Sequence, residues 1–251
     1  NKTNHLTGNF SESFAKLNTV FLQLIVMVMS FAPIGVFCLI GKFVIADGLD
    51  IFQDVLAYVI LLISLLLFHA FFTYSIFLKF VGGLSPITFF KKIKNVALFA
   101  FSTSSSAATI PVTLKTVNQD LGVNQNVASF VVPVGATINM DGTAIMQGLA
   151  TVFIAQMSGI DLTLFQYGQV VLLAVATSIG TAAVPSAGTI TLIIILQQFN
   201  LPLEAIGIIL AVDRVLDMIR TSVNVTGDAA IACIVAKSEN QLDENIFNSH
   251  K

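Results

Sequence analysis

One helix-length segment, residues 212–230, carries five charged residues inside a long apolar run: VDRVLDMIRTSVNVTGDAA. Arg214 lies off the main stripe and is not expected to be a ligand. With 3.6 residues per turn, one stripe about 80° wide collects the remaining charges and one amide, those of Asp213, Asp217, Arg220, Asn224 and Asp228. Three carboxylates against one guanidinium leave an excess of negative charge that a mobile cation would balance. The segment therefore predicts a site for a cation or a cationic group.

The composition is that of a protein surrounded by lipid. Of 251 residues, 55% are hydrophobic and only 10% are charged, whereas soluble domains carry about 25% charged residues. The net charge is −2 and the basic residues form no groove-sized cluster, which argues against a nucleic-acid partner. The sequence starts with neither a methionine nor a signal peptide, so we expect a piece of a longer protein.

The apolar runs predict an all-α membrane protein built from transmembrane helices and two re-entrant helical hairpins. A lysine-rich loop containing Lys79, Lys91, Lys92 and Lys94 is expected in the cytoplasm, opposite a loop with Asp47, Asp50 and Asp54. The predicted segments are a polar N-terminal segment at 1–16, transmembrane helices at 17–46 and 51–82, a first re-entrant hairpin at 85–120, a broken transmembrane helix at 126–160, a second hairpin at 162–200, the charged transmembrane helix at 202–237 and a polar C-terminal tail at 238–251.

Three polar or small-residue breaks interrupt these apolar runs: STSSSAATIP, NMDGT and GTAAVPSAG. Non-helical backbone is tolerated at membrane depth only where protein buries it or where it lines a cavity. Broken helices also expose free N–H and C=O groups, which bind anions and cations respectively. The breaks and the charged helix together predict an ion and solute site at the membrane midplane.

Two residues allow a second interpretation at this point. His69, inside the second helix, is either a proton relay or a hydrogen-bonded packing residue, and the latter is favoured. Arg220 either binds a ligand or forms salt bridges with Asp213 or Asp217 that only hold helices together.

Four motifs occur in one order and spacing that resemble the dicarboxylate/amino-acid:cation symporters: STSSSAATIPVT, PVGATINMDGTA, SIGTAAVPSAGTITL and DRVLDMIRTSVNVTGDA. This family includes archaeal aspartate transporters and animal excitatory amino-acid transporters, and the resemblance runs over about residues 20–237. It implies a partial glutamate-transporter fold, with 17–46 as a scaffold helix and the second hairpin as a gate. It also implies a homotrimer, an elevator motion, and N-terminal helices beyond this sequence.

The resemblance assigns a role to each substrate-site residue. Asp217 would hold the ammonium of the substrate and Arg220 its side-chain carboxylate, to which a planar guanidinium is suited. The α-carboxylate would be held by Ser105 and Ser106, and the remaining contacts would come from Thr143, Val184, Thr221 and Asn224.

Sodium ions are the co-transported species that the resemblance implies, with no organic cofactor; hard cations prefer oxygen ligands. The first ion would use Gly135, Asn139, Asn224 and Asp228, and the second would use Thr137, Met140, Ser178, Ile179 and Thr181. A third would use Asn139 and Asp141 together with partners on a helix outside this sequence.

Three positions depart from relatives in the family. Ser104 stands where archaeal members carry an arginine, and Met218 stands where animal glutamate transporters carry one. Gln147 replaces a glutamate linked in animal carriers to proton symport and potassium antiport. Since glutamine carries no such proton, we expect sodium coupling without that cycle, and Asp228 also favours sodium.

The resulting prediction is a sodium-coupled symporter of aspartate or glutamate in the plasma (inner) membrane, not an enzyme. The alternative within the fold is a proton- or sodium-coupled symporter of dicarboxylates or neutral amino acids. A membrane serine hydrolase is disfavoured because G-x-S-x-G requires glycine at Val184, and no histidine shares a motif with a serine. A channel lined by the same stripe is the other alternative, and saturable flux that requires a sodium gradient would favour the carrier.

Overall fold

A computed structural model describes residues 51–249 and isolated positions between residues 17 and 45. The predicted N-terminal segment 1–16 and most of the predicted scaffold helix 17–46 lie outside the described residues. Within the described part the protein is all-α, as predicted, and its only β pairing is an isolated bridge between Val123 and Leu242. The helices are α3 (Ile51–Phe68), η1 (His69–Thr73), α4 (Tyr74–Ile76), η2 (Phe77–Val81), α5 (Pro86–Thr103), α6 (Ser106–Gln119), α7 (Gln125–Ile138), α8 (Asp141–Met157), α9 (Leu164–Ile179), α10 (Ala187–Gln198), η3 (Leu203–Ala205), α11 (Ile206–Ser238) and α12 (Glu244–Asn248).

The first four of these elements join end to end into one long apolar helix. It covers residues 51–81, and an 18-residue stretch of it has a mean hydropathy of 2.6; among the described residues it is the one helix long and apolar enough to cross a membrane. Asp54, predicted in a loop, lies in the first turn of this helix. This position is favourable because an acidic side chain interacts well with the positive end of the helix dipole. Phe52, Leu56, Phe68 and Phe72 are exposed along it.

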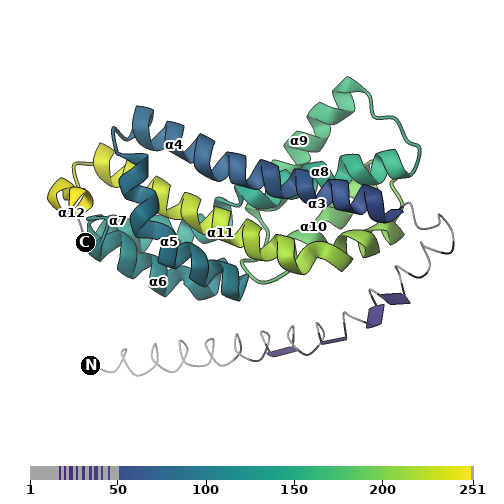
Figure 1. The fold of residues 1–251 in the computed structure, drawn as a ribbon, viewed down its shortest axis with the longest axis horizontal. Coiled ribbons are helices and arrows are strands. Elements are labelled where there is room, and N and C mark those ends of the chain that lie inside the picture. The colour runs from purple at the N-terminus through teal and green to yellow at the C-terminus, as the bar shows by residue number, and fades with distance from the viewer. Residues whose placement is uncertain are drawn as a thin grey trace, which may run out of the picture.

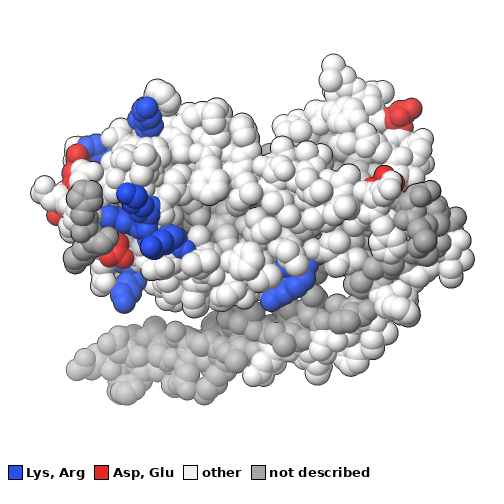
Figure 2. All heavy atoms as spheres, viewed as in Figure 1, with Lys and Arg blue, Asp and Glu red and all other residues white. Residues whose placement is uncertain are grey.

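Charge is distributed as in a protein surrounded by lipid. On the face seen in Figure 2, charged side chains gather at the two ends of the long axis, and the band between them carries little charge. The lysines predicted in a loop belong to helices: Lys79 is in η2, and Lys91, Lys92 and Lys94 are in α5. Helix α5 begins before these three lysines, because Ser85 caps it and Pro86 occupies its first position.

Two helical hairpins lie within the segments predicted for them. In the first, α5 and α6 are joined by Ser104 and Ser105; Ser104 is left-handed (φ 51°), and the Ser105 side chain caps α6 by accepting from the Ala108 N–H. In the second, α9 and α10 are joined by residues 180–186, and Ser186 is also left-handed (φ 59°). A left-handed residue thus turns the chain at each hairpin tip.

The NMDGT motif breaks one helix into two. Helix α7 ends at Ile138, Asn139 and Met140 are non-helical, and α8 begins at Asp141. The break leaves carbonyl groups at the end of α7 and N–H groups at the start of α8 without helical partners. An acid in the first turn of α8 complements the positive end of its dipole.

Helix α11 is the central element of the molecule. It packs against α3, α5, α6, α7, α8 and α10, and Figure 1 shows it running along the long axis between the α3–α4 helix and the first hairpin. The apolar core divides along it: one cluster includes Leu216 and Val223, and the other includes Val225 and Ala229. The polar stripe is thus centred where the two clusters meet.

The C-terminal segment, predicted as a polar tail, contains the short helix α12, which packs against the rest of the molecule. Phe247 in α12 is only 1% exposed, because it packs into the second core cluster. The ammonium of Lys92 donates to the carbonyls of Asp120 at 2.8 Å and Ile246 at 2.6 Å. The Asp243 N–H donates to the carbonyl of Gly122, which closes this end of the molecule.

We predict that Gly122→Ala destabilises this end. Gly122 has φ +75°, and an added methyl group would overlap the carbonyl oxygen of Asp243. We expect a loss of about 1–3 kcal/mol in the free energy of unfolding and a lower thermal midpoint by circular dichroism. Gly168→Ala, with open space inside α9, is the matched control and should not lower it. A wild-type midpoint for Gly122→Ala would contradict this packing.

Candidate functional site

A small polar pocket lies where the two hairpin tips, the break before α8 and the stripe of α11 converge. Its volume is about 20 Å³, room for about one water molecule. The tips close over it: the Ser105 hydroxyl donates to the Ala183 carbonyl at 2.8 Å, and the Ala107 N–H reaches the same oxygen at 3.3 Å. The pocket is lined by Ser104, Ser106, Met140, Thr143, Thr181, Ala182, Ala183, Val184, Gly188, Asp217, Arg220, Thr221 and Asn224.

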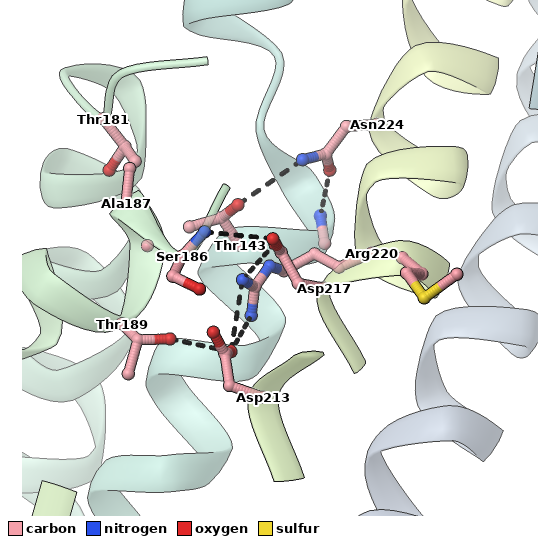
Figure 3. Close-up of polar contacts among 12 residues, drawn as sticks. Thr143, Thr181, Ser186, Ala187, Thr189, Asp213, Asp217, Arg220 and Asn224 are labelled. Atoms are coloured by element: carbon pink, nitrogen blue, oxygen red, sulfur yellow. Dashed lines mark hydrogen bonds and ion pairs between the residues drawn. The ribbon is translucent and has the colours of Figure 1, made fainter. Parts of the chain in front are cut away.

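The guanidinium of Arg220 lies between two carboxylates on its own helix (Figure 3). Its Nη2 is 2.5 Å from Asp217 Oδ1, and both terminal nitrogens are 3.4 Å from Asp213 Oδ1. All three side chains are nearly inaccessible to solvent, with Arg220 2% exposed. Two carboxylates against one guanidinium leave one buried negative charge, as the stripe predicted.

The salt bridges that the sequence offered as an alternative role for Arg220 are thus formed, but they do not connect two helices. Both ion pairs of Arg220 are within α11, so they do not hold two helices together. The second hairpin is attached to the carboxylates by hydrogen bonds instead. The Ser186 N–H donates to Asp217 Oδ2 at 3.0 Å, and the Thr189 hydroxyl donates to Asp213 Oδ1 at 2.8 Å. Asp213 Oδ2 is buried and has no hydrogen-bond partner among the described residues.

Asn224 joins the stripe to the start of α8. Its Oδ1 accepts from the Gly142 N–H at 2.8 Å, and its Nδ2 donates to the Thr143 hydroxyl at 3.4 Å. Any side chain at position 142 would collide, since an added Cβ would lie 2.9 Å from Asn224 Oδ1 and 3.0 Å from Arg220 Cγ. The glycine of NMDGT therefore allows α8 to approach α11 closely at the pocket.

The residues predicted for the first sodium ion meet at one place. Asn139 Nδ2 donates to Asp228 Oδ1 at 3.0 Å and points to the Asn224 carbonyl at 3.5 Å. The Asp228 carboxylate also lies against Gly135, where an added Cβ would be 2.6 Å from Oδ1. This cluster offers a buried carboxylate and backbone oxygens, which suit a hard cation.

The residues predicted for the second sodium ion are only partly gathered. Met140 and Thr181 line the pocket, and the Ser178 carbonyl accepts from the Thr181 N–H at 3.1 Å. Ile179 is 45% exposed. Thr137 is also exposed, and its hydroxyl donates to the Val134 carbonyl of its own helix.

The two residues predicted for the third ion lie at the break between α7 and α8. Asn139 contacts Asp228 as described, and Asp141 Oδ2 is 3.0 Å from His69 Nε2 and 3.2 Å from the Tyr74 hydroxyl. His69 is therefore hydrogen-bonded, as the favoured interpretation of the sequence had it. No group of three or more metal-binding His, Cys, Asp or Glu side chains occurs in the described part of the chain.

Gln147 binds both arms of the second hairpin to α8. Its amide nitrogen donates to the Gly188 carbonyl at 3.0 Å and to the Thr191 hydroxyl at 2.7 Å. Its amide oxygen accepts from the Thr177 hydroxyl at 2.8 Å. The side chain is fully buried, so an ionised carboxylate here would face the Gly188 carbonyl without a proton to donate.

The structure places most, but not all, of the predicted substrate residues in the pocket. Ser106, Thr143, Val184, Asp217, Arg220, Thr221 and Asn224 line it. Ser105 does not, because its hydroxyl is committed to the opposite tip at Ala183.

Sequence reasoning missed the Ser186 N–H, the Thr189 hydroxyl and Tyr74. The first two become visible only when the second tip folds over the stripe. Tyr74 lies five residues after His69, a spacing that no regular helix would bring to one face.

Comparison with known proteins gives one consistent result. Residues 2–238 match the model of the sodium:dicarboxylate symporter family. The chain is 42% identical over 243 residues to excitatory amino acid transporter 2 of Mus musculus, which covers 96% of this chain and 42% of that protein. It is 40% identical over 224 residues to an excitatory amino acid transporter of Caenorhabditis elegans, covering 88% of this chain and 44% of that protein.

The chain thus spans less than half the length of these relatives. The family match itself covers nearly the whole chain, and it includes both hairpins, the NMDGT break and the charged stripe. The chain belongs to the sodium:dicarboxylate symporter family.

Proposed function

We propose that the complete protein is a sodium-coupled symporter that carries aspartate or glutamate across the membrane. The observation that carries this proposal is the closed pocket with Arg220 between Asp213 and Asp217. An acidic amino acid brings one ammonium and one side-chain carboxylate, which match the charges of Asp217 and Arg220. The family and the names of its relatives, excitatory amino acid transporters, support the same substrate class.

Binding in this proposal is an exchange of ion pairs. The substrate ammonium takes the place of Arg220 beside Asp217, and Arg220 turns to the substrate carboxylate. Removing one partner of a buried pair costs about 3–5 kcal/mol when nothing replaces it. A dicarboxylate without an amino group leaves Asp217 unpaired, and a neutral amino acid leaves Arg220 without its carboxylate. Both losses oppose the alternative substrates of the same fold.

The second hairpin acts as the gate. A pocket of about 20 Å³ cannot hold an amino acid, so a tip must withdraw before binding. The Ser186 N–H and the Ser105 hydroxyl hold the second tip in place, and both bonds break when it moves. In the proposed cycle Ser106 and the N–H groups at the first tip receive the α-carboxylate once the space opens, as helix N-termini do for anions.

Sodium completes the site through oxygen ligands on the break and on α11. Asp228 with Gly135, Asn139 and Asn224 forms the first ion site in this proposal. The second uses Thr137, Met140, Ser178, Ile179 and Thr181. Asn139 and Asp141 serve the third. Gln147 keeps its hydrogen bonds without a titrating proton, which fits transport without a proton and potassium cycle.

The surroundings of the transporter are part of the proposal. In this proposal the protein lies in the plasma (inner) membrane and forms a homotrimer. Its hairpins and central helices move together across the membrane in an elevator motion. It needs neither an organic cofactor nor a nucleic-acid partner.

The test is uptake of radiolabelled L-aspartate by the complete protein in proteoliposomes. We expect saturable uptake with an inward sodium gradient, and none with a potassium or pH gradient alone. Uptake driven by protons alone would contradict the assignment of the coupling ion. Non-saturable flux that ignores the gradient would favour a channel.

Arg220→Cys should shift the substrate preference of the transporter from acidic to neutral amino acids. Without the guanidinium nothing pairs with the side-chain carboxylate, so we expect aspartate uptake at sub-saturating concentration to fall by at least about 100-fold. Uptake of serine or cysteine should rise relative to it. Arg214→Cys is the matched control, because Arg214 is exposed on the same helix and outside the stripe. Unchanged acidic selectivity in Arg220→Cys would remove the role given to Arg220.

Asp228→Asn should weaken sodium dependence while leaving the shape of the site intact. Asparagine is nearly isosteric but carries no charge to balance a cation, so the sodium concentration for half-maximal uptake should rise about tenfold. Asp161→Asn, at an exposed position between α8 and α9, should behave as wild type. The assignment of Asp228 fails if both variants show the wild-type sodium curve.

A further inference from the structure

A π-helical turn in the long first helix brings two polar side chains to one face. In η1 (His69–Thr73) the Tyr74 N–H donates to the His69 carbonyl, an i→i+5 bond. Residues five apart in a regular α-helix point about 140° away from each other, whereas an i→i+5 bond stacks them one turn apart. The rings of His69 and Tyr74 accordingly lie edge to face with centroids 4.8 Å apart. Such turns occur frequently at functional sites.

Both side chains reach one oxygen of Asp141. Its Oδ2 is 3.0 Å from His69 Nε2 and 3.2 Å from the Tyr74 hydroxyl. No hydrogen bond from the described residues reaches Oδ1, and the side chain is 36% exposed. The carboxylate is therefore fixed through one oxygen while the other stays available to a ligand.

The Tyr74 hydroxyl is buried against helix α11, which carries the polar stripe. The residue is 3% exposed, and its hydroxyl is also 3.3 Å from the Val223 carbonyl. An added Cβ at Gly227 would overlap this hydroxyl and lie 2.6 Å from Asn139 Nδ2. The glycine of NVTGD thus leaves the space that Tyr74 occupies, directly beside the Asn139 amide that donates to Asp228.

We propose that Tyr74 is a positioning residue for the Asp141 carboxylate at a sodium site, with the π-helical turn as the device that aims it. The inference rests on the sodium coupling of the proposed function and adds to it a residue of this chain. Holding the carboxylate in one orientation before the ion arrives lowers the ordering cost of binding, so affinity for a hard cation rises. His69 supports the same oxygen, which leaves Oδ1 available to the ion.

The test compares two tyrosine-to-phenylalanine variants of the complete protein. Tyr74→Phe keeps the buried ring and removes only the hydroxyl. Tyr58→Phe is the matched control: this hydroxyl is also buried in the same long helix, and it has no hydrogen-bond partner among the described residues. Thermal unfolding is measured without amino acid, as sodium chloride replaces choline chloride at constant ionic strength. A ligand that binds only the folded protein raises the unfolding midpoint with its concentration.

We expect the sodium concentration for half of the full stabilisation to rise at least about fivefold in Tyr74→Phe and to stay unchanged in Tyr58→Phe. A lower unfolding midpoint at every sodium concentration, with the same half-saturation point as wild type, would show a packing role only and overturn the proposal. Wild-type behaviour of Tyr74→Phe, or no sodium stabilisation of the wild type, would overturn it as well.

Measuring aspartate uptake on the same variants separates this inference from the proposed function. A shifted sodium response without any acidic amino-acid uptake would support the role of Tyr74 and reject the substrate. Sodium-driven uptake with the same sodium midpoint in wild type and Tyr74→Phe would support the transporter and reject the role of Tyr74.

Discussion

The burial of one guanidinium with two carboxylates is the interaction on which the rest of this structure depends. Arg220, Asp213 and Asp217 lie on one helix, nearly sealed from solvent, with one negative charge in excess. Such a group is stable in an apolar molecule only if hydrogen bonds compensate its charges and lipid is kept away. The second hairpin donates one hydrogen bond to each carboxylate and covers the pocket, and among the described residues only Asp213 Oδ2 of these carboxylate oxygens has no hydrogen-bond partner.

The irregular features of the chain follow from this demand. A continuous helix could not direct backbone N–H groups at α11, so α8 starts at the site and presents the Gly142 N–H to Asn224. The left-handed Ser186 likewise turns its N–H toward Asp217. Glycines at 142 and 188 are needed because an added Cβ would collide with Arg220 and with Thr143 respectively. Two of the breaks that looked like interruptions of membrane helices therefore supply hydrogen-bond donors to the buried polar stripe, one to Asp217 and one to Asn224.

The sequence predicted those parts whose cause is local. Periodicity and small-residue breaks predict the all-α class, the positions of the hairpins and the polar stripe. The four sequence motifs indicate the family. What it missed depends on contacts between distant segments: Ser105 turned to Ala183, Thr189 bonded to Asp213, and α12 packed through Phe247. Tyr74 was missed for a different reason, since a π-helical turn changes which residues share a face and leaves no periodic signal.

The most direct test of the central claim is the affinity of the complete protein for three small ligands, measured by calorimetry in saturating sodium. L-Aspartate offers an ammonium to Asp217 and a side-chain carboxylate to Arg220. Succinate lacks the ammonium, and L-asparagine lacks the side-chain carboxylate. If substrate binding is an exchange of buried ion pairs, succinate and asparagine bind at least about 100-fold more weakly than aspartate. Affinity for either analogue within a few-fold of that for aspartate would contradict the account.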